Sequence, residues 1–202
     1  WLSPESANDQ ASDSRASHSA SASAPDGGTG LPDGTPATSA PVSESPSEES
    51  AKDQATAIDD LLQESAADRR KVINAVNAVE ACRSPDSVQS AMTDLQEAAE
   101  RRDSLIERLA ELDVDAVDGG AAATADLKAA WQHSADADRA FADWAAAMAG
   151  GGCVPGSAPH DADYDRGVAS SGKATTSKEA FVAKWNPIAR EHGLPSRSAD
   201  DI

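Results

Sequence analysis

HSADADRAFADW, residues 133–144, lies at the centre of a segment whose apolar residues recur with the period of an α-helix. The face that starts at Leu127 and advances by three or four residues carries Trp131, Ser134, Asp138, Phe141, Ala145 and Met148. Asp138 thus stands where the pattern requires an apolar side chain. A carboxylate in an apolar interior is costly unless cations or hydrogen-bond donors surround it. The segment therefore predicts a helix that faces a core and, within that core, basic partners for Asp138.

The first 49 residues differ in composition from the rest of the chain. They are rich in Ser, Ala, Pro, Gly, Thr and acidic residues, and Arg15 is their one basic residue. Such a segment buries too little apolar area to offset the entropy of ordering it. We therefore expect residues 1–49 to form a disordered stalk with a reach of about 35 to 40 Å. Residues 50–202 are long enough to fold around a single core.

The charge of the chain restricts its partners. The formal net charge is −18, and no segment gathers Lys and Arg into a basic face. Nucleic acids are bound mainly through cations that neutralise phosphates, so we expect no nucleic-acid partner. The surface of a membrane rich in anionic lipids would repel the chain as well. The expected partner is a protein or a cell-envelope component, basic where it is charged, and no cofactor is expected.

The start of the sequence suggests a location outside the cytoplasm. No segment approaches the roughly 20 apolar residues that cross a bilayer. Trp1 and Leu2 are residues typical of the point where a transmembrane helix leaves the membrane. We therefore expect an upstream anchor as the only membrane contact, with the stalk and the folded part outside. A cytosolic protein is the alternative.

After the stalk, the apolar periodicity predicts helices throughout and no strand. Ser84 is a candidate N-cap, and Pro85 suits the first position of the second helix. Thr176 and Glu179 form a capping-box pattern that predicts the start of a short fourth helix. The expected helices cover about residues 50–83, 85–112, 122–149 and 176–191, with a long connection over 150–175. Short links between the first three helices favour an all-α, up-down-up-down four-helix bundle of three long helices and one short.

The two cysteines fit this topology. Cys82 ends the first helix and Cys153 follows the third, and the predicted topology brings both ends to the same pole. We therefore expect a Cys82–Cys153 disulfide, which implies an oxidising compartment. Two unrelated thiols in a reducing cytosol are the alternative.

The disulfide sets a register for the remaining polar residues of the core. Its offset places Asp138 within a helical turn of Arg69 on the first helix, and helix pairing brings Arg102 of the second helix to the same level. Ser134 and Ser65 complete this predicted layer. One interpretation is a polar layer that only fixes the register of the helices. The other is a binding site, because two arginines beside one aspartate leave a positive charge for a small anion or carboxylate.

A second acidic pattern raises the possibility of a metal. Asp161, Asp163 and Asp165 alternate as the ligands of calcium loops do. An EF-hand would require Gly and Glu where the chain has Arg166 and Gly172. A different kind of calcium site and a solvated acidic loop remain the two interpretations.

The residues that usually perform catalysis are scattered. The four histidines, His18, His133, His160 and His192, fall in separate predicted elements. No spacing pairs a nucleophile with a base, so we expect no enzyme. The large aromatic residues Trp131, Trp144 and Trp185 are expected in the core, with a surface patch of Trp144 and Trp185 as the alternative.

The Ala/Asp/Arg-rich, Lys-poor sequence, its acidic Ser/Pro segment and the stretches AFADWA (140–145) and FVAKWNPIAREHGLPSR (181–197) resemble exported or membrane-anchored helical proteins of high-GC actinobacteria. The resemblance implies a location outside the cytoplasm and no particular activity. Together these observations predict a non-enzymatic extracytoplasmic interaction or sensing domain. The alternative is a helical bundle that binds a small anion or carboxylate at its Arg/Asp layer.

Overall fold

The fold consists of helices. The computed structural model describes residues 46–154 and 156–202, with the backbone alone for 46–49. Its main elements are α1 (Pro46–Ala81), α2 (Pro85–Glu111), α3 (Gly120–Ala147) and α4 (Ala162–Glu191). The predicted all-α class is confirmed, since the described part of the chain contains no strand. Residues 1–45 of the predicted stalk lie outside the described residues, and α1 begins at Pro46, four residues before the predicted boundary.

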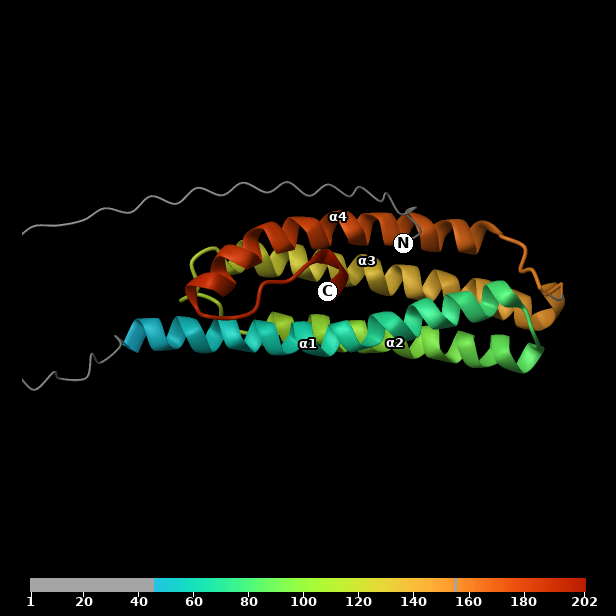
Figure 1. Cartoon of the computed structure of the whole chain (residues 1–202), viewed down its shortest axis with the longest axis horizontal. Helices are drawn as coiled ribbons and strands as arrows, with labels where there is room; N and C mark the ends of the chain where they lie inside the picture. The colour runs from blue at the N-terminus through green and yellow to red at the C-terminus, as the bar shows by residue number, and fades with distance from the viewer. Residues whose placement is uncertain (1–45, 155) are drawn as a thin grey trace, which may run out of the picture. The chain divides into compact units, whose positions relative to one another are not determined.

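Consecutive helices pack against one another. The chain reverses direction from each long helix to the next (Figure 1), and α1 contacts α2, α2 contacts α3 and α3 contacts α4. The tight link between α1 and α2 follows from its sequence. Ser84 caps α2 by accepting a hydrogen bond from Ser87 N, and Ser87 Oγ accepts one in return from Ser84 N. Pro85 fills the first helical position, where the missing N–H has no cost.

The prediction of a short fourth helix was wrong. The segment predicted as a loop over 150–175 is helical from Ala162 onward, and α4 has 30 residues. Asp161 is the actual N-cap, and its carboxylate accepts hydrogen bonds from the backbone N–H groups of Asp163 and Tyr164. The many small residues of 167–176 let α4 lie close to α3. A Cβ at Gly167 would lie 2.6 Å from the ring of Phe141.

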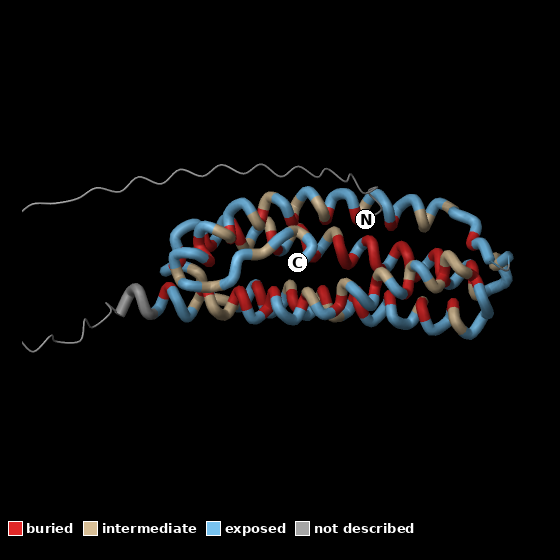
Figure 2. Tube along the Cα trace, viewed as in Figure 1, coloured by how far each residue is buried: buried red, intermediate tan, exposed pale blue. Residues whose placement is uncertain are grey.

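The interior contains two apolar cores that follow one another along the helices. Figure 2 shows buried positions on the sides of the helices that face one another. The first core includes Ile58, Leu62, Leu105, Leu109, Leu127, Trp131, Phe181 and Trp185. The second includes Val72, Val79, Val88, Leu95, Phe141, Trp144 and Met148. On every helix the two cores are separated by a turn or more that carries polar side chains.

The segment after α4 fills the space between α1 and α4. We call residues 193–202 the strap; it ends in a short 3₁₀ turn, Ala199–Asp201, that contacts both helices. Figure 1 shows it returning between α1 and α4. Arg197 Nη2 lies 2.6 Å from Asp59 Oδ1 on α1, and Asn186 of α4 pairs with the backbone N–H and C=O of Arg197. The side chain of Ile202 is fully buried in the first core.

The disulfide lies at the end of the bundle where α1 ends and α2 begins. Cys82 and Cys153 are bonded, with their Cα atoms 5.6 Å apart, so the predicted pairing is confirmed. A π-helical turn (Met148–Gly152) leads from α3 to Cys153, and Ala158 N donates to the carbonyl of Glu80. A disulfide of this kind fits an oxidising compartment. None of the helices in the described part of the chain has the length and apolarity to span a membrane.

Candidate functional site

The polar layer between the two cores centres on one buried ion pair. Arg102 Nε of α2 lies 2.8 Å from Asp138 Oδ2 of α3, and the two side chains are 1% and 3% exposed. Arg102 is one of the two partners predicted for the aspartate of the HSADADRAFADW segment. The guanidinium uses only Nε for this bond. Its Nη1 and Nη2 atoms are buried, and neither has a hydrogen-bond partner in the described part of the chain.

Arg69 reaches the layer with a different partner from the predicted one. Its Nη1 lies 2.6 Å from Asp200 Oδ1 of the strap, whereas the sequence paired it with Asp138. The strap explains the difference, because it brings a carboxylate to α1 that no helix register could have indicated. The neighbouring residue Asp68 is buried and lies 2.9 Å from Arg101 Nε of α2.

Lys178 of α4 is the member of the layer that the sequence analysis missed. Its side chain is buried, although Lys is among the residues least often found inside proteins. Burial, helped by the charges of Arg102 and Arg69, lowers the pKa of Lys178 from 10.5 to about 7, while Asp138 and Asp200 oppose the shift. The sequence did contain a signal. Lys178 lies three residues before Phe181 and seven before Trp185, on the apolar face of α4 and inside the helix that was predicted over 176–191.

Burial acts on Asp138 in the opposite sense. It raises the pKa of the Asp138 carboxyl above its ordinary value, while the charges of Arg102 and Lys178 lower it and that of Asp68 raises it further. Asp138 and Lys178 therefore each carry their charge at a cost. The layer holds ionisable groups whose environments push their pKa values toward each other, a property that is common at functional sites and in structural ion pairs alike.

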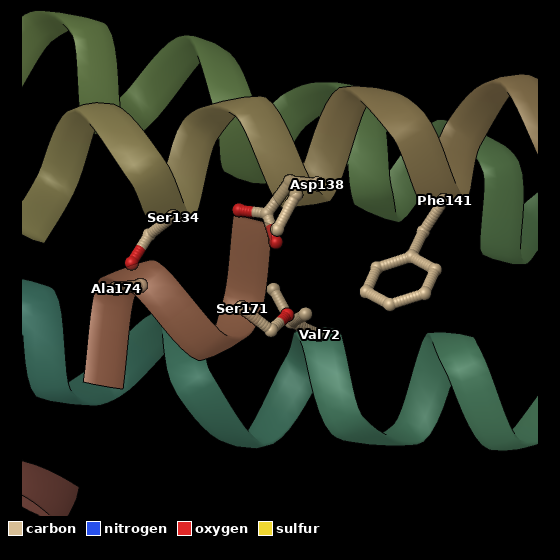
Figure 3. Close-up of a pocket in the computed structure, with 7 residues that line it drawn as sticks. Val72, Ser134, Asp138, Phe141, Ser171 and Ala174 are labelled. Atoms are coloured by element: carbon tan, nitrogen blue, oxygen red, sulfur yellow. The ribbon is translucent and has the colours of Figure 1, made fainter. Parts of the chain in front are cut away.

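A small cavity borders Asp138. It lies between α1, α3 and α4, and its volume is about 10 Å³. Figure 3 shows Asp138, Ser134 and Phe141 of α3 with Ser171 and Ala174 of α4 and Val72 of α1 around it. This volume is near the lower limit for one water molecule. Ser134 is thus placed beside Asp138 as predicted, and Ser171 is a second hydroxyl that the sequence did not single out.

Ser65, the other predicted hydroxyl, lies on α1 one turn before Arg69. Its side chain is fully buried, and Oγ has no hydrogen-bond partner among the residues that the structure describes. The helix pairing brings Ser65 to the side of the layer that adjoins the first core. The predicted residues therefore occupy neighbouring turns of three helices, and the strap supplies a partner of Arg69 that was not predicted. These residues are Ser65, Arg69, Arg102, Ser134 and Asp138.

The acidic pattern at the start of α4 does not form a metal site. Asp161 caps the helix, and Asp163 forms an ion pair with Arg166 one turn later. Within residues 46–154 and 156–202, no group of three or more His, Cys, Asp or Glu side chains is arranged to hold a metal. A helix turns Asp163 away from the side on which Asp161 and Asp165, four residues apart, lie.

The three tryptophans of the helices are core residues, as expected. Trp131, Trp144 and Trp185 have no exposed surface, so the alternative of a Trp144–Trp185 surface patch is wrong. Trp144 Nε1 donates to the carbonyl of Pro159 and thereby holds the segment after the disulfide. Next to it, the ring of His160 stacks on Tyr164 at 3.6 Å, and Nε2 lies 2.9 Å from Glu80 Oε1.

No protein-family model, curated protein or solved structure matches this chain. The charge balance of the site follows from its own residues. Its cations are Arg69, Arg101, Arg102 and Lys178, and its carboxylates are Asp68, Asp138 and Asp200. With Lys178 protonated the cations are in excess by one charge, and with Lys178 neutral the layer is balanced. Such a layer can fix the register of four helices, and it can attract an anion.

Proposed function

We propose that this chain is a non-enzymatic interaction or sensing domain outside the cytoplasm, an up-down-up-down four-helix bundle tethered to the cell envelope through the predicted stalk. The observation that carries the proposal is the Cys82–Cys153 disulfide. Structural disulfides persist in oxidising compartments and are rare in the cytosol. The resemblance of the sequence to exported actinobacterial helical proteins supports the same location.

The closed interior supports an interaction at the surface. The cavity at the polar layer has a volume of about 10 Å³, too small for a substrate or an organic ligand. The chain has a formal net charge of −18, which would attract a basic protein or a basic envelope component.

The location can be tested in intact cells that produce the protein. A membrane-impermeant amine reagent should label Lys52 and Lys128, which are exposed on α1 and α3. A thiol reagent should leave Cys82 and Cys153 unmodified until a reductant is added. Labelling of the lysines only after lysis, together with alkylation of both thiols without reductant, would contradict an extracytoplasmic location.

The interaction can be tested with purified protein and isolated envelopes of the producing cells. We expect saturable binding whose apparent Kd rises several-fold between about 50 mM and 500 mM salt, because screening weakens contacts between exposed charges. As a control, the protein with Cys82 and Cys153 reduced and alkylated lacks the cross-link. It shows whether binding requires the disulfide-bonded fold. Uptake that grows linearly with concentration and ignores salt would exclude a specific charged partner.

A second candidate function is a bundle that binds a small anion or carboxylate at the polar layer. The observation that favours it is Arg102, whose Nη1 and Nη2 atoms are buried without a hydrogen-bond partner in the described part of the chain. Buried guanidinium groups normally use these donors. Because the cavity beside Asp138 is too small for such a ligand, this function requires part of the bundle to move.

A further inference from the structure

The first two turns of α3 present small side chains to solvent. Ala121, Ala122 and Ala125 are all exposed there. Two surface hollows border this stretch, one toward α2 and one toward α4. Alanine side chains leave such space between the longer residues of neighbouring segments. A hollow with apolar walls is a place where a partner can bury side chains of its own.

The first hollow lies between the end of α2 and the start of α3. Its volume is about 260 Å³, and it is lined by Leu109, Leu112 and Val114 together with Ala121, Ala125 and Lys128. Leu112 and Val114 are only partly buried, so apolar surface stays accessible in the folded chain. The space is smaller than the cavities of about 300 to 1,000 Å³ that enclose drug-sized ligands. It suits a few aliphatic side chains of a larger partner.

The second hollow lies between the start of α3 and the end of α4. Its volume is about 280 Å³, and its apolar residues include Ala122, Pro187 and Ile188. Lys184 also lines it, but its amine pairs with Asp126. Two apolar hollows beside one helix match the anchor residues that recur along an amphipathic helix.

The rims of both hollows are acidic. The link after α2 carries exposed carboxylates at Glu111, Asp113 and Asp115, next to the apolar lining of the first hollow. Asp118 and Glu191 line the second hollow. None of these five carboxylates forms an ion pair within residues 46–154 and 156–202. A partner with Lys or Arg beside its apolar residues would supply complementary charge.

The link that carries these carboxylates is anchored to the bundle. Ala116 N donates to Gln54 Oε1 of α1 at 2.9 Å, and Val117 is buried in the first core. The N–H groups of Val117 and Gly120 donate to the carbonyls of Val114 and Val117. A surface that is already formed loses little conformational entropy when a partner binds.

We propose that the two hollows and their acidic rims form a docking surface for a basic amphipathic helix of a partner protein. Apolar side chains of the partner enter the hollows, and its Lys and Arg residues face the carboxylates of the link. Lys128, two helical turns beyond Ala121, repels cations and so directs the basic residues toward the link. The inference rests on the proposed interaction function and names its partner. A second copy of this chain fits poorly, since its net charge of −18 opposes approach to an acidic surface.

The first test measures the Kd of a fluorescent peptide of about 15 residues, built of Leu and Lys at helical spacing, by anisotropy. Glu111→Lys with Asp115→Lys reverses two charges at the rim and should raise the Kd at least about tenfold. Asp94→Lys with Glu100→Lys makes the same change in net charge at exposed positions earlier on α2, and should raise it less than about threefold. If both double variants raise the Kd equally, only net charge attracts the peptide and the proposal is wrong.

The second test addresses the hollows. Ala125→Phe fills the first hollow and should raise the Kd of the Leu/Lys peptide at least about tenfold. Ala146→Phe, at an exposed position near the other end of α3, should leave it unchanged. A peptide with Ser in place of Leu should bind more weakly and should not respond to Ala125→Phe. Circular dichroism checks that each variant is folded.

Two results of the second test would overturn the proposal. One is equal binding of the Leu and Ser peptides by the wild type, and the other is an unchanged Kd for Ala125→Phe. Dimerisation of the wild type that Ala125→Phe abolishes would overturn it too, because it assigns the surface to a second copy. If the peptide tests fail while isolated envelopes still show saturable, salt-sensitive binding, the interaction function stands and its surface lies elsewhere.

Discussion

At the scale of single residues, the buried Arg102–Asp138 ion pair lies between the two apolar cores. Asp138→Leu would leave the Arg102 guanidinium buried without its carboxylate. Breaking a buried ion pair from one side typically costs about 3 to 5 kcal/mol. We therefore expect Asp138→Leu to lower the free energy of unfolding, measured in urea, by about that amount.

The matched variants separate pairing from simple loss of a charge. Arg102→Met combined with Asp138→Leu should recover most of the lost stability, because apolar residues of similar volume replace buried ion pairs well. Asp103→Ala removes the carboxylate of the Arg139–Asp103 ion pair, in which both side chains are 47% exposed, and should change the stability by less than about 1 kcal/mol. Equal losses for Asp138→Leu and Asp103→Ala would show that burial of the pair does not matter.

Lys178 makes stability depend on pH in a defined direction. Its pKa is lowered from 10.5 to about 7 in the folded chain, so between these values the unfolded chain binds more protons. The contribution of Lys178 to stability therefore rises with pH from about 7 to about 10.5, and below about 7 the full penalty of burying the charge is present. The groups that set this value are Arg102, Arg69, Asp138 and Asp200.

Lys178→Met tests this dependence. The variant should be more stable than the wild type at about pH 7, and the difference should shrink by about 2 kcal/mol toward pH 9. Asp138 has a raised pKa, which acts in the opposite sense as pH rises, but it is present in both proteins and largely cancels in the difference. Urea unfolding of both proteins at several pH values measures it. A difference that is constant with pH would mean that Lys178 keeps an ordinary pKa in the folded chain.

At the scale of elements, the contact between α3 and α4 depends on one missing side chain. Gly167→Ala would place Cβ 2.6 Å from the ring of Phe141, so the ring or the helix must shift. Overpacking of this kind typically costs about 1 to 3 kcal/mol, more than the gain in helix propensity. We expect a lower midpoint of thermal unfolding for Gly167→Ala.

Gly172 of the same helix is the natural control. A Cβ at Gly172 would have no atom within 4 Å, and its backbone is helical. Gly172→Ala should therefore stabilise the protein by about 0.5 to 1 kcal/mol through helix propensity alone. If both variants move the midpoint in the same direction, the close approach of α4 to Phe141 is not a constraint in solution.

The same helix shows where pattern reasoning failed. The face of α3 that carries Asp138 has large apolar residues at regular intervals, so its helix and its inward side followed from the sequence. The first half of α4 has Gly, Ala and Ser instead, and these residues have no preference that separates a loop from a helix packed at short range. The position of Asp161 as N-cap was readable in principle, but the alternating aspartates suggested a metal loop.

At the scale of the whole molecule, the disulfide closes the segment that contains α2 and α3 into one loop. Cys82 and Cys153 are 71 residues apart, and a cross-link over such a loop stabilises by about 4 kcal/mol in the chain-entropy model. The double variant Cys82→Ser, Cys153→Ser should therefore unfold at a clearly lower temperature than the wild type. Wild-type protein in reductant should match the double variant, and the double variant should not respond to reductant. An unchanged midpoint in both experiments would contradict a stabilising cross-link.

The amino-acid sequence by itself determined the helical class, the disulfide and the pairing of Asp138 with Arg102. These features depend on the period of apolar residues and on a register counted from the cysteines, both of which are local or linear properties of the chain. The tertiary structure alone decided the partners of Arg69 and the role of Lys178. Asp200 reaches Arg69 because the strap folds back between α1 and α4, and Lys178 is buried because α4 packs against α3. Neither follows from spacing, since both depend on which surfaces a segment covers after the helices have packed.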